Sequence, residues 1–261
     1  MVSAQQLYEL WADESAIDEA LGRSLDPRGT EWLYTAFAAL GPKPGDLVLD
    51  AGARDAKHAI RLVQELGVRA IALDPVPVHG ELARAAVAEA GLADEIEVVE
   101  AAIESIPLAD ASVDWIWCRD VLVHVDAERG LAELARVLRP GGALLAYVTL
   151  ATERLEPRER AELAEAIAIR TFDADVLEAA GDDAGLTLRS VDRLGSEWRE
   201  RMIEDGTWNP GPDLLHIARL LRGELAGPAA EAAWGGLVWG IYQLLGKTCP
   251  TVYVWSRASS T

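Results

Sequence analysis

Between residues 46 and 150, the chain alternates short apolar runs with amphipathic segments. The apolar runs predict β-strands, and the segments between them predict helices. Strands joined through helices run parallel, with right-handed crossovers, so we expect a parallel sheet covered by helices. The third crossover is short and is expected to contain little helix. The predicted strands are residues 46–51, 68–73, 95–100, 112–118 and 142–149, and the predicted helices are residues 55–66, 78–91 and 126–138.

Beyond residue 150 the alternation stops. Helices are predicted at residues 156–170 and 173–184, followed by a sixth strand at residues 186–191. Residues 195–245 are predicted to be mostly helical, and residues 251–255 alternate as a last strand would. A helical segment of about 50 residues is too long for a connecting loop. We therefore interpret it as a cap over the carboxyl ends of the strands, where ligands bind in open α/β sheets.

Helical patterns also precede the alternating region. Residues 3–40 carry apolar side chains at helical spacing, and the glycines and prolines of residues 41–45 separate them from the first predicted strand. The chain is therefore expected to have four parts. They are an N-terminal helical lid (residues 1–40), a ligand-binding core (41–194), a helical cap inserted into the core (195–250) and the last strand of the core sheet (251–261).

The composition argues against several classes of function. A net charge of −19 argues against an extended nucleic-acid surface, because phosphate binding needs clustered lysine and arginine. Cys118 and Cys249 are too few for a disulfide scaffold and fit no zinc pattern, so no metal site is expected. The N-terminus lacks a secretion signal, and no apolar run reaches the length of a membrane span. We expect a cytoplasmic protein that binds neither nucleic acid nor membrane.

The most informative stretch is DLVLDAGARDAK, residues 46–57. An apolar strand ends at Asp50, a small turn follows around Gly52, and a helix is predicted from about Asp55. In a strand, turn and helix of this kind, the backbone approaches a nucleotide-like ligand and presents free N–H groups to it. Asp74 ends the next strand, about 20 residues farther on, where an acidic residue would meet ribose hydroxyls.

Four segments together resemble the class I S-adenosylmethionine-dependent methyltransferases, of the small-molecule type common in bacterial secondary metabolism. The resemblance implies an α/β, Rossmann-like fold. Its seven-stranded sheet is mostly parallel with an antiparallel last strand, has helices on both faces and carries a helical cap. It also implies S-adenosylmethionine as the cofactor. The matching segments are residues 46–57, residues 70–75 (AIALDP), residues 101–125 (AAIESIPLADASVDWIWCRDVLVHV) and residues 131–147 (LAELARVLRPGGALLAY).

The resemblance also implies which residues hold the cofactor. Asp50 would face the ammonium of its methionine part, and Asp74 would accept hydrogen bonds from both ribose hydroxyls. Ile103 would lie on the adenine face. The alternatives are that Asp50 caps the next turn and that Asp74 belongs to an Asp-Pro turn. The cofactor-binding residues implied by the family are Asp50, Gly52, Ala53, Arg54, Asp74, Pro75, Ala102, Ile103, Glu104 and Arg119.

Three positions depart from the family pattern. Arg54 and Ala56 stand where the family has glycines, and Ala102 stands where many relatives have an Asp near the adenine amino group. Arg54 either pairs with an acid or reaches an anion of the substrate. The departures leave two alternative hypotheses open: a non-methylating enzyme such as a cyclase or eliminase, and a silent partner subunit on the same scaffold.

Candidates for catalysis follow the fourth predicted strand. Methyl transfer is an in-line displacement at a sulfonium, and a general base helps when the acceptor is a hydroxyl or a protonated amine. His124 is the first candidate, with a packing or helix-start role as its alternative. Asp120 is the second, with helix capping as its alternative. His58, beside Lys57 on the predicted first helix of the core, is expected to be partly exposed and is not predicted to be a ligand.

The acceptor is expected in the cap. Residues 195–200 and 242–247 mix aromatic and polar side chains, and four of the nine tryptophans lie in the cap: Trp198, Trp208, Trp234 and Trp239. An aromatic cavity suits an apolar or cationic small molecule, whereas filling of a helical core is the alternative. The first hypothesis is methyl transfer to O, N or C of a small metabolite. The sequence leaves a homodimer or a protein partner open.

Overall fold

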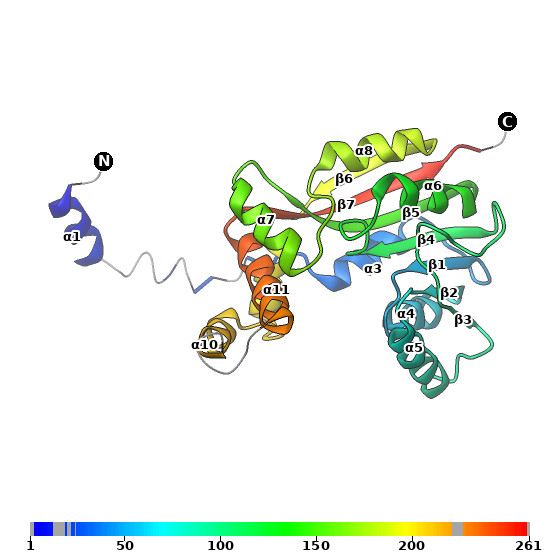
Figure 1. Cartoon of the computed structure of the whole chain (residues 1–261), viewed down its shortest axis with the longest axis horizontal. Helices are drawn as coiled ribbons and strands as arrows, with labels where there is room; N and C mark the ends of the chain where they lie inside the picture. The colour runs from blue at the N-terminus through cyan, green and yellow to red at the C-terminus, as the bar shows by residue number, and fades with distance from the viewer. Residues whose placement is uncertain (1–2, 13–18, 20–21, 24, 221–226, 260–261) are drawn as a thin grey trace.

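The computed structural model of the chain describes residues 3–12, 19, 22–23, 25–220 and 227–259. Within these residues, seven strands form one sheet in the order β3-β2-β1-β4-β5-β7-β6 (Figure 1). β7 runs antiparallel to both of its neighbours, and the other pairings are parallel, which confirms the predicted sheet. The strands are β1 (Leu47–Ala51), β2 (Arg69–Leu73), β3 (Ile96–Val99), β4 (Val113–Arg119), β5 (Leu138–Ala151), β6 (Leu186–Arg193) and β7 (Thr248–Arg257).

The sheet separates two apolar cores, one on each face. Successive side chains of a strand point to opposite faces, so Trp117 of β4 joins one core while Ile116 and Cys118 join the other. Helices α3 (Thr30–Ala38), α4 (Lys57–Leu66) and α5 (Pro77–Glu89) bury apolar side chains in the Trp117 core. Helices α6 (Ala127–Val137), α7 (Pro157–Ala166) and α8 (Ala174–Asp183) do so in the other. Helices therefore cover both faces, as expected for strands buried on both sides.

The junction between α6 and β5 differs from the sequence-based expectation. The predicted helix ends at residue 138 and the predicted strand begins at residue 142, whereas the structure passes directly from α6 into β5 at Leu138. Pro140 lies within β5 and is accommodated there because the register between β4 and β5 shifts between Val113 and Trp115. Proline is tolerated at such an irregularity because no ladder hydrogen bond is required of it there.

The segment predicted as an N-terminal lid is described only in part. Helix α1 (Ala4–Ala12) lies away from the sheet (Figure 1), whereas α3 packs into a core through Leu33, Tyr34 and Phe37. Residues 1–2, 13–18, 20–21 and 24 of the predicted lid lie outside the described residues.

The predicted cap region contains helices α9 (Glu197–Glu204), α10 (Pro210–Leu220) and α11 (Pro228–Leu244). Trp198 of α9 packs on Tyr147 of β5, with ring centroids 4.6 Å apart. At the carboxyl end of β5, the Thr152 hydroxyl donates to the Gly246 carbonyl just after α11. These contacts place the helical segment next to the carboxyl ends of the central strands. No helix in the described part of the chain is long and apolar enough to cross a membrane.

Candidate functional site

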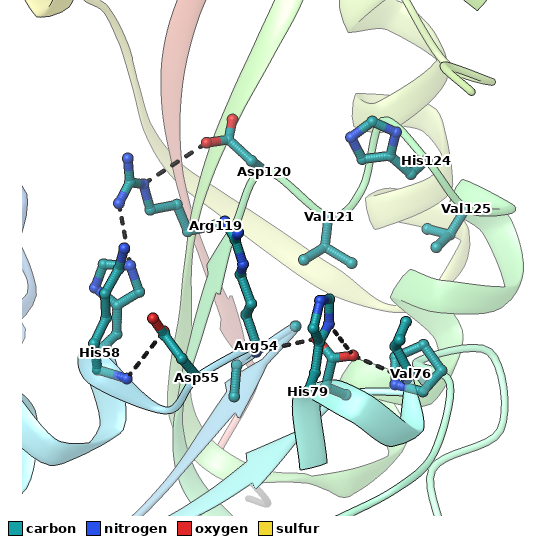
Figure 2. A pocket seen from close by; sticks show the side chains of 15 residues that line it. Arg54, Asp55, His58, Val76, His79, Arg119, Asp120, Val121, His124 and Val125 are labelled. Atoms are coloured by element: carbon teal, nitrogen blue, oxygen red, sulfur yellow. Dashed lines mark hydrogen bonds and ion pairs between the residues drawn. The ribbon is translucent and has the colours of Figure 1, made fainter. Parts of the chain in front are cut away.

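A pocket of about 550 Å³ opens beyond the carboxyl ends of β1, β2 and β4 (Figure 2). This is the edge of the sheet at which the sequence predicts ligand binding. Its volume is in the usual range for small-molecule sites. Eight of the predicted site residues line it: Gly52, Ala53, Arg54, Asp74, Pro75, Arg119, Asp120 and His124. The pocket is also lined by Asp55, Lys57, His58, Val76, His79, Val121 and Val125, which were not among the predicted site residues.

The turn between β1 and α4 has a backbone that ordinarily needs glycine. Gly52 has a φ of 84°, and a Cβ atom there would lie 2.1 Å from Val121 Cγ2. Arg54 and Ala56, the two departures from the glycine-rich pattern, also have positive φ, at 53° and 59°. A side chain in this left-handed region costs roughly 1–2 kcal/mol relative to the right-handed one. The chain therefore keeps the loop geometry of the glycine-rich pattern without two of its glycines.

The same turn is tied to the end of β2. The N–H groups of Gly52 and Ala53 both donate to the Leu73 carbonyl, at 2.8 and 3.0 Å. The Arg54 N–H donates to Asp74 Oδ2 at 3.0 Å. The Arg54 side chain is exposed and has no carboxylate partner among the described residues. These bonds fix the loop over the sheet and leave the Arg54 side chain at the pocket.

Asp74 closes β2 in the wall of the pocket. Its Oδ1 accepts from the Val76 N–H at 3.0 Å and lies 3.0 Å from Nδ1 of His79, while Oδ2 accepts from Arg54. An ionised carboxylate has about four acceptor sites, so these three contacts leave capacity for a further donor. The contact to Val76 is the Asp-Pro turn that the sequence left as an alternative, and it is compatible with a ligand contact because 12% of the side chain remains accessible.

Asp50 does not line the pocket. It is 1% exposed, and its Oδ2 accepts from the Ala59 N–H at 3.0 Å, in the first turn of α4. Burial raises the pKa of Asp50 to about 7. The contact that the structure shows is thus the capping alternative, in which the acid at the end of β1 satisfies a free N–H of the next helix.

The adenine segment predicted from the family also lies outside this pocket. Ile103 is 2% exposed, and its Cδ1 lies 3.0 Å from the position that a Cβ of Gly130 on α6 would take. The Ala102 carbonyl accepts a hydrogen bond from the Ser105 N–H, and the Glu104 carboxylate accepts one from the Asp126 N–H at 3.4 Å. The structure therefore places Ala102, Ile103 and Glu104 beside the start of α6 rather than in the lining.

Arg119 and Asp120 follow β4 at the opposite wall. Arg119 Nη1 donates to Nε2 of His58 at 3.1 Å, and Arg119 Nε lies 3.7 Å from Asp120 Oδ2 (Figure 2). Asp120 has a φ of 56°. Partial removal from water in the pocket wall raises the pKa of Asp120, while Arg119 and Arg199 act in the opposite direction. A raised pKa moves this carboxyl group toward the range useful for a general base near neutral pH.

His124 lies on the same loop but makes a different kind of contact. Its ring is exposed, and Nδ1 lies 3.3 Å from the backbone carbonyl of Ala168. The other ring nitrogen is given no hydrogen bond by the described residues. His124 thus lines the pocket with its ring anchored on one side only.

His58 is the main residue for which the sequence-based expectation was wrong. It was expected to be partly exposed, but it is 8% exposed, between Arg119 and the Tyr34 hydroxyl, which contacts Nδ1. Burial, together with nearby Arg119, lowers the pKa of His58 to about 3, so the ring is neutral. Arg119 can only donate, which places the ring proton on Nδ1 and makes the Tyr34 oxygen its acceptor. Neighbours in the sequence gave no sign of this contact, because Tyr34 and Arg119 come from distant segments.

A second pocket, of about 970 Å³, adjoins the first. Lys57, His58 and Arg119 line both pockets, so the two share a wall. The remaining lining of the second pocket comes mainly from residues 26–34 and from α9, including Trp32 and Trp198. In the part of the chain that the structure describes, no group of three or more His, Cys, Asp or Glu side chains could hold a metal ion.

The comparisons with known proteins agree with this geometry. Residues 49–146 match the family model described as a methyltransferase domain. The chain is 31% identical to the demethylmenaquinone methyltransferase of a Mycobacterium species (strain KMS), over 67% of this chain and 78% of that protein. It is 32% identical to the dimethylglycine N-methyltransferase of Parasynechococcus marenigrum, over 59% of this chain and 57% of that protein. The chain spans about half the length of several other curated relatives that it matches.

The fold is also shared with solved structures. A candidate sarcosine dimethylglycine methyltransferase from Galdieria sulphuraria superimposes with a TM-score of 0.71, over 88% of this chain and 86% of that one, at 23% identity. At this identity the likeness concerns the fold. Together with the sequence relatives, it shows that the chain belongs to the class I S-adenosylmethionine-dependent methyltransferase family.

Proposed function

We propose that the chain transfers the methyl group of S-adenosylmethionine to an O, N or C atom of a small metabolite, in secondary metabolism. The observation that carries the proposal is the combination of the left-handed turn at residues 52–56 with Asp74 in one pocket at the carboxyl edge of the sheet. That turn lets backbone approach a ligand closely, and Asp74 offers an accepting carboxylate beside it.

The residues present fit the cofactor. Gly52 leaves no room for a Cβ, so the loop stays close to Val121, and the free acceptor capacity of Asp74 suits ribose hydroxyls. The bound cofactor would supply a methyl group activated by its sulfonium. Asp50 acts indirectly in this proposal, by capping α4 and holding the turn, because its carboxylate points at Ala59.

The loop after β4 carries the groups that would act on the acceptor. Asp120 lines the pocket with a raised pKa and would accept a proton from a hydroxyl or protonated amine. His124 lines the pocket from the same loop, and its contact with the Ala168 carbonyl holds the ring in place. We propose that His124 assists the proton transfer to Asp120. Lining both pockets, Arg119 would lie where cofactor and acceptor meet.

The first test is calorimetry with S-adenosylmethionine and S-adenosylhomocysteine. We expect both to bind, and Asp74→Asn to weaken both by about tenfold or more, because charge-assisted hydrogen bonds are lost. Asp94→Asn is the matched control, since Asp94 is exposed and precedes β3 at the opposite edge of the sheet. We expect Asp94→Asn to bind both compounds with the affinity of the unmodified protein.

If neither compound binds at millimolar concentration, the proposal is contradicted. That result would favour a non-methylating enzyme or a partner subunit on this scaffold. If both compounds bind, incubation with labelled S-adenosylmethionine and an extract of small metabolites tests the transfer itself. Label in an extracted small molecule is expected, and its loss in Asp120→Asn would support the proposed base.

A further inference from the structure

Two arginines lie near Asp120 without a close carboxylate partner among the described residues. Arg119 ends β4, and its closest carboxylate oxygen, Oδ2 of Asp120, is 3.7 Å from Nε. Nε itself is buried, and its N–H donates a hydrogen bond to no described residue. Arg199 lies on α9 and has no carboxylate within 4.0 Å in the described part of the chain. The two arginines and Asp120 together carry a net positive charge.

The remaining partners of Arg119 are neutral. Nη1 donates to His58, whose ring is uncharged because Arg119 occupies Nε2 and burial disfavours a second proton. The guanidinium carbon lies 5.6 and 5.4 Å from the ring centroids of Tyr147 and Trp198. His58 and the two aromatic rings therefore orient Arg119 without compensating its charge, and His58 serves as a positioning residue.

Arg199 is surrounded in the same way. Nε donates to Gln243 Oε1 at 2.9 Å, Nη1 contacts Met202 Sδ at 3.4 Å, and the guanidinium stands 4.9 Å from the Trp208 ring centroid. Burial lowers the pKa of Arg199, and the charge of Asp120 opposes that effect. Met202, which Arg199 contacts, lines the second pocket. Arg199 does not itself line either pocket, but through Met202 it contacts the wall of the second one.

Other arginines around the second pocket are compensated. The closest N···O distance is 2.6 Å between Arg28 and Glu197, 2.5 Å between Arg61 and Glu31, and 2.6 Å between Arg201 and Asp26. Asp26 and Glu31, two of the three acidic residues that line this pocket, are thus paired with arginines. A desolvated cation without a counter-charge is unfavourable, and a chain of net charge −19 has acidic residues to spare. Arg119 and Arg199 therefore differ from the other arginines around the second pocket.

We propose that Arg119 and Arg199 bind an anionic group of the methyl acceptor, a carboxylate or a phosphate, with the rest of the acceptor in the second pocket. Guanidinium groups suit both anions because they offer several donors in one plane. The negative charge of the anion would compensate the positive charges of Arg119 and Arg199. The shared wall of the two pockets then places the acceptor beside the methyl donor. This inference rests on the proposed function and names the substrate class of the same site.

The first experiment uses the full chain with saturating S-adenosylhomocysteine. Benzoate, its neutral analogue benzamide and inorganic phosphate are each titrated, and the midpoint of thermal unfolding is measured. We expect benzoate and phosphate to raise the midpoint, since a ligand of the native state stabilises it, and benzamide to leave it unchanged. In Arg119→Gln and in Arg199→Gln, the concentration of benzoate needed for the same shift should increase by about tenfold or more.

The matched control is Arg158→Gln. Arg158 lies on α7 with 89% of its side chain exposed, so its removal changes the net charge equally but touches neither pocket. We expect its response to benzoate to match that of the unmodified protein. Equal shifts with benzoate and benzamide, no shift with either anion, or the same loss in Arg158→Gln would each overturn the proposal.

A second measurement separates the acceptor from the cofactor, which also carries a carboxylate. Binding of S-adenosylhomocysteine is compared with binding of 5′-methylthioadenosine, which lacks the amino acid part. We expect Arg199→Gln to bind both as the unmodified protein does. Loss of affinity for S-adenosylhomocysteine alone in Arg199→Gln would assign this arginine to the cofactor and overturn the proposal. Normal binding of both compounds without anion selectivity would overturn this inference while leaving methyl transfer intact.

The unfolding midpoint of the variants, measured without anion, distinguishes a binding role of the arginines from a structural one. Removing a desolvated cation that lacks a counter-charge is expected to leave the unfolding midpoint of Arg199→Gln unchanged or higher. A large decrease in that midpoint would instead mean that Arg199 holds α9 against Gln243 and Trp208, and it would count against a binding role.

Discussion

At the scale of single residues, the site is set by backbone conformations that its side chains disfavour. Arg54, Ala56 and Asp120 all have positive φ and all lie at the pocket or at its edge. Strain of this kind persists where the surrounding structure holds it, and it is concentrated at functional sites. Here the bonds from Gly52 and Ala53 to Leu73 and from Arg54 to Asp74 hold the turn.

The strain predicts that a glycine at position 56 stabilises the protein. Ala56→Gly relieves the left-handed conformation, which outweighs the greater freedom of glycine in the unfolded chain, so we expect a gain of up to about 1 kcal/mol in the free energy of unfolding. Ala85→Gly is the control on an exposed turn of α5, where the same change should cost about 1 kcal/mol. Denaturation by urea measures both. Destabilisation of equal size in both variants would show that position 56 carries no strain.

At the scale of elements, the helices after β6 are fixed by close packing against the core and against α7. Trp198 attaches α9 to Tyr147, and α11 contacts α7 through Gly235. A Cβ at Gly235 would lie 2.7 Å from the Ala166 Cβ, whereas a Cβ at the neighbouring Gly236 would meet nothing within 4 Å. Adjacent glycines of one helix thus have different roles, one in packing and one without a contact.

The two glycines provide a matched test of the α7–α11 contact. We expect Gly235→Ala to lower the free energy of unfolding by about 1–3 kcal/mol, because the helices must move apart. Gly236→Ala should raise it by up to about 1 kcal/mol through helix propensity. Urea denaturation followed by circular dichroism measures both effects. Stabilisation by both substitutions would mean that α11 packs less closely on α7 than the structure shows.

At the scale of the whole molecule, the second pocket differs in charge from the rest of the chain. The chain carries a net charge of −19, yet five basic and three acidic side chains line this pocket, and Arg199 contacts it through Met202. A negative exterior around a positive interior site repels anions at long range and binds them at short range, so salt is expected to affect binding and stability separately.

The net charge predicts that salt stabilises the protein. Raising sodium chloride from about 10 mM to about 150 mM shortens the screening length from about 30 Å to about 8 Å, which weakens the self-repulsion. Exposed ion pairs contribute little each, so their screening should not reverse the effect. We expect the midpoint of thermal unfolding to rise with added salt. It should rise also in Arg199→Gln, which lacks one arginine that could bind chloride, because the effect comes from screening. A fall with added salt would show that the ion pairs outweigh the repulsion.

The sequence alone determined the layout of the sheet. The apolar runs ending at Ala51, Leu73 and Arg119 lie within a residue or two of the predicted strands, because alternating strand and helix patterns are local properties of the chain. The turn at Gly52 and the acid at Asp74 were also predictable, since both follow strand ends whose carboxyl edges meet in a parallel sheet. Eight of the predicted site residues line the pocket for this reason.

Contacts between distant segments could only be decided by the tertiary structure. Burial of His58 between Tyr34 and Arg119 depends on α3 reaching the start of α4, and the contact of Arg119 with α9 depends on where Trp198 packs. The direction of the Asp50 carboxylate toward α4, and of Ile103 toward α6, was likewise invisible in the motifs. A side chain at a strand end has several neighbours within reach, and only the packed chain selects which of them offers the better hydrogen bond or the drier contact.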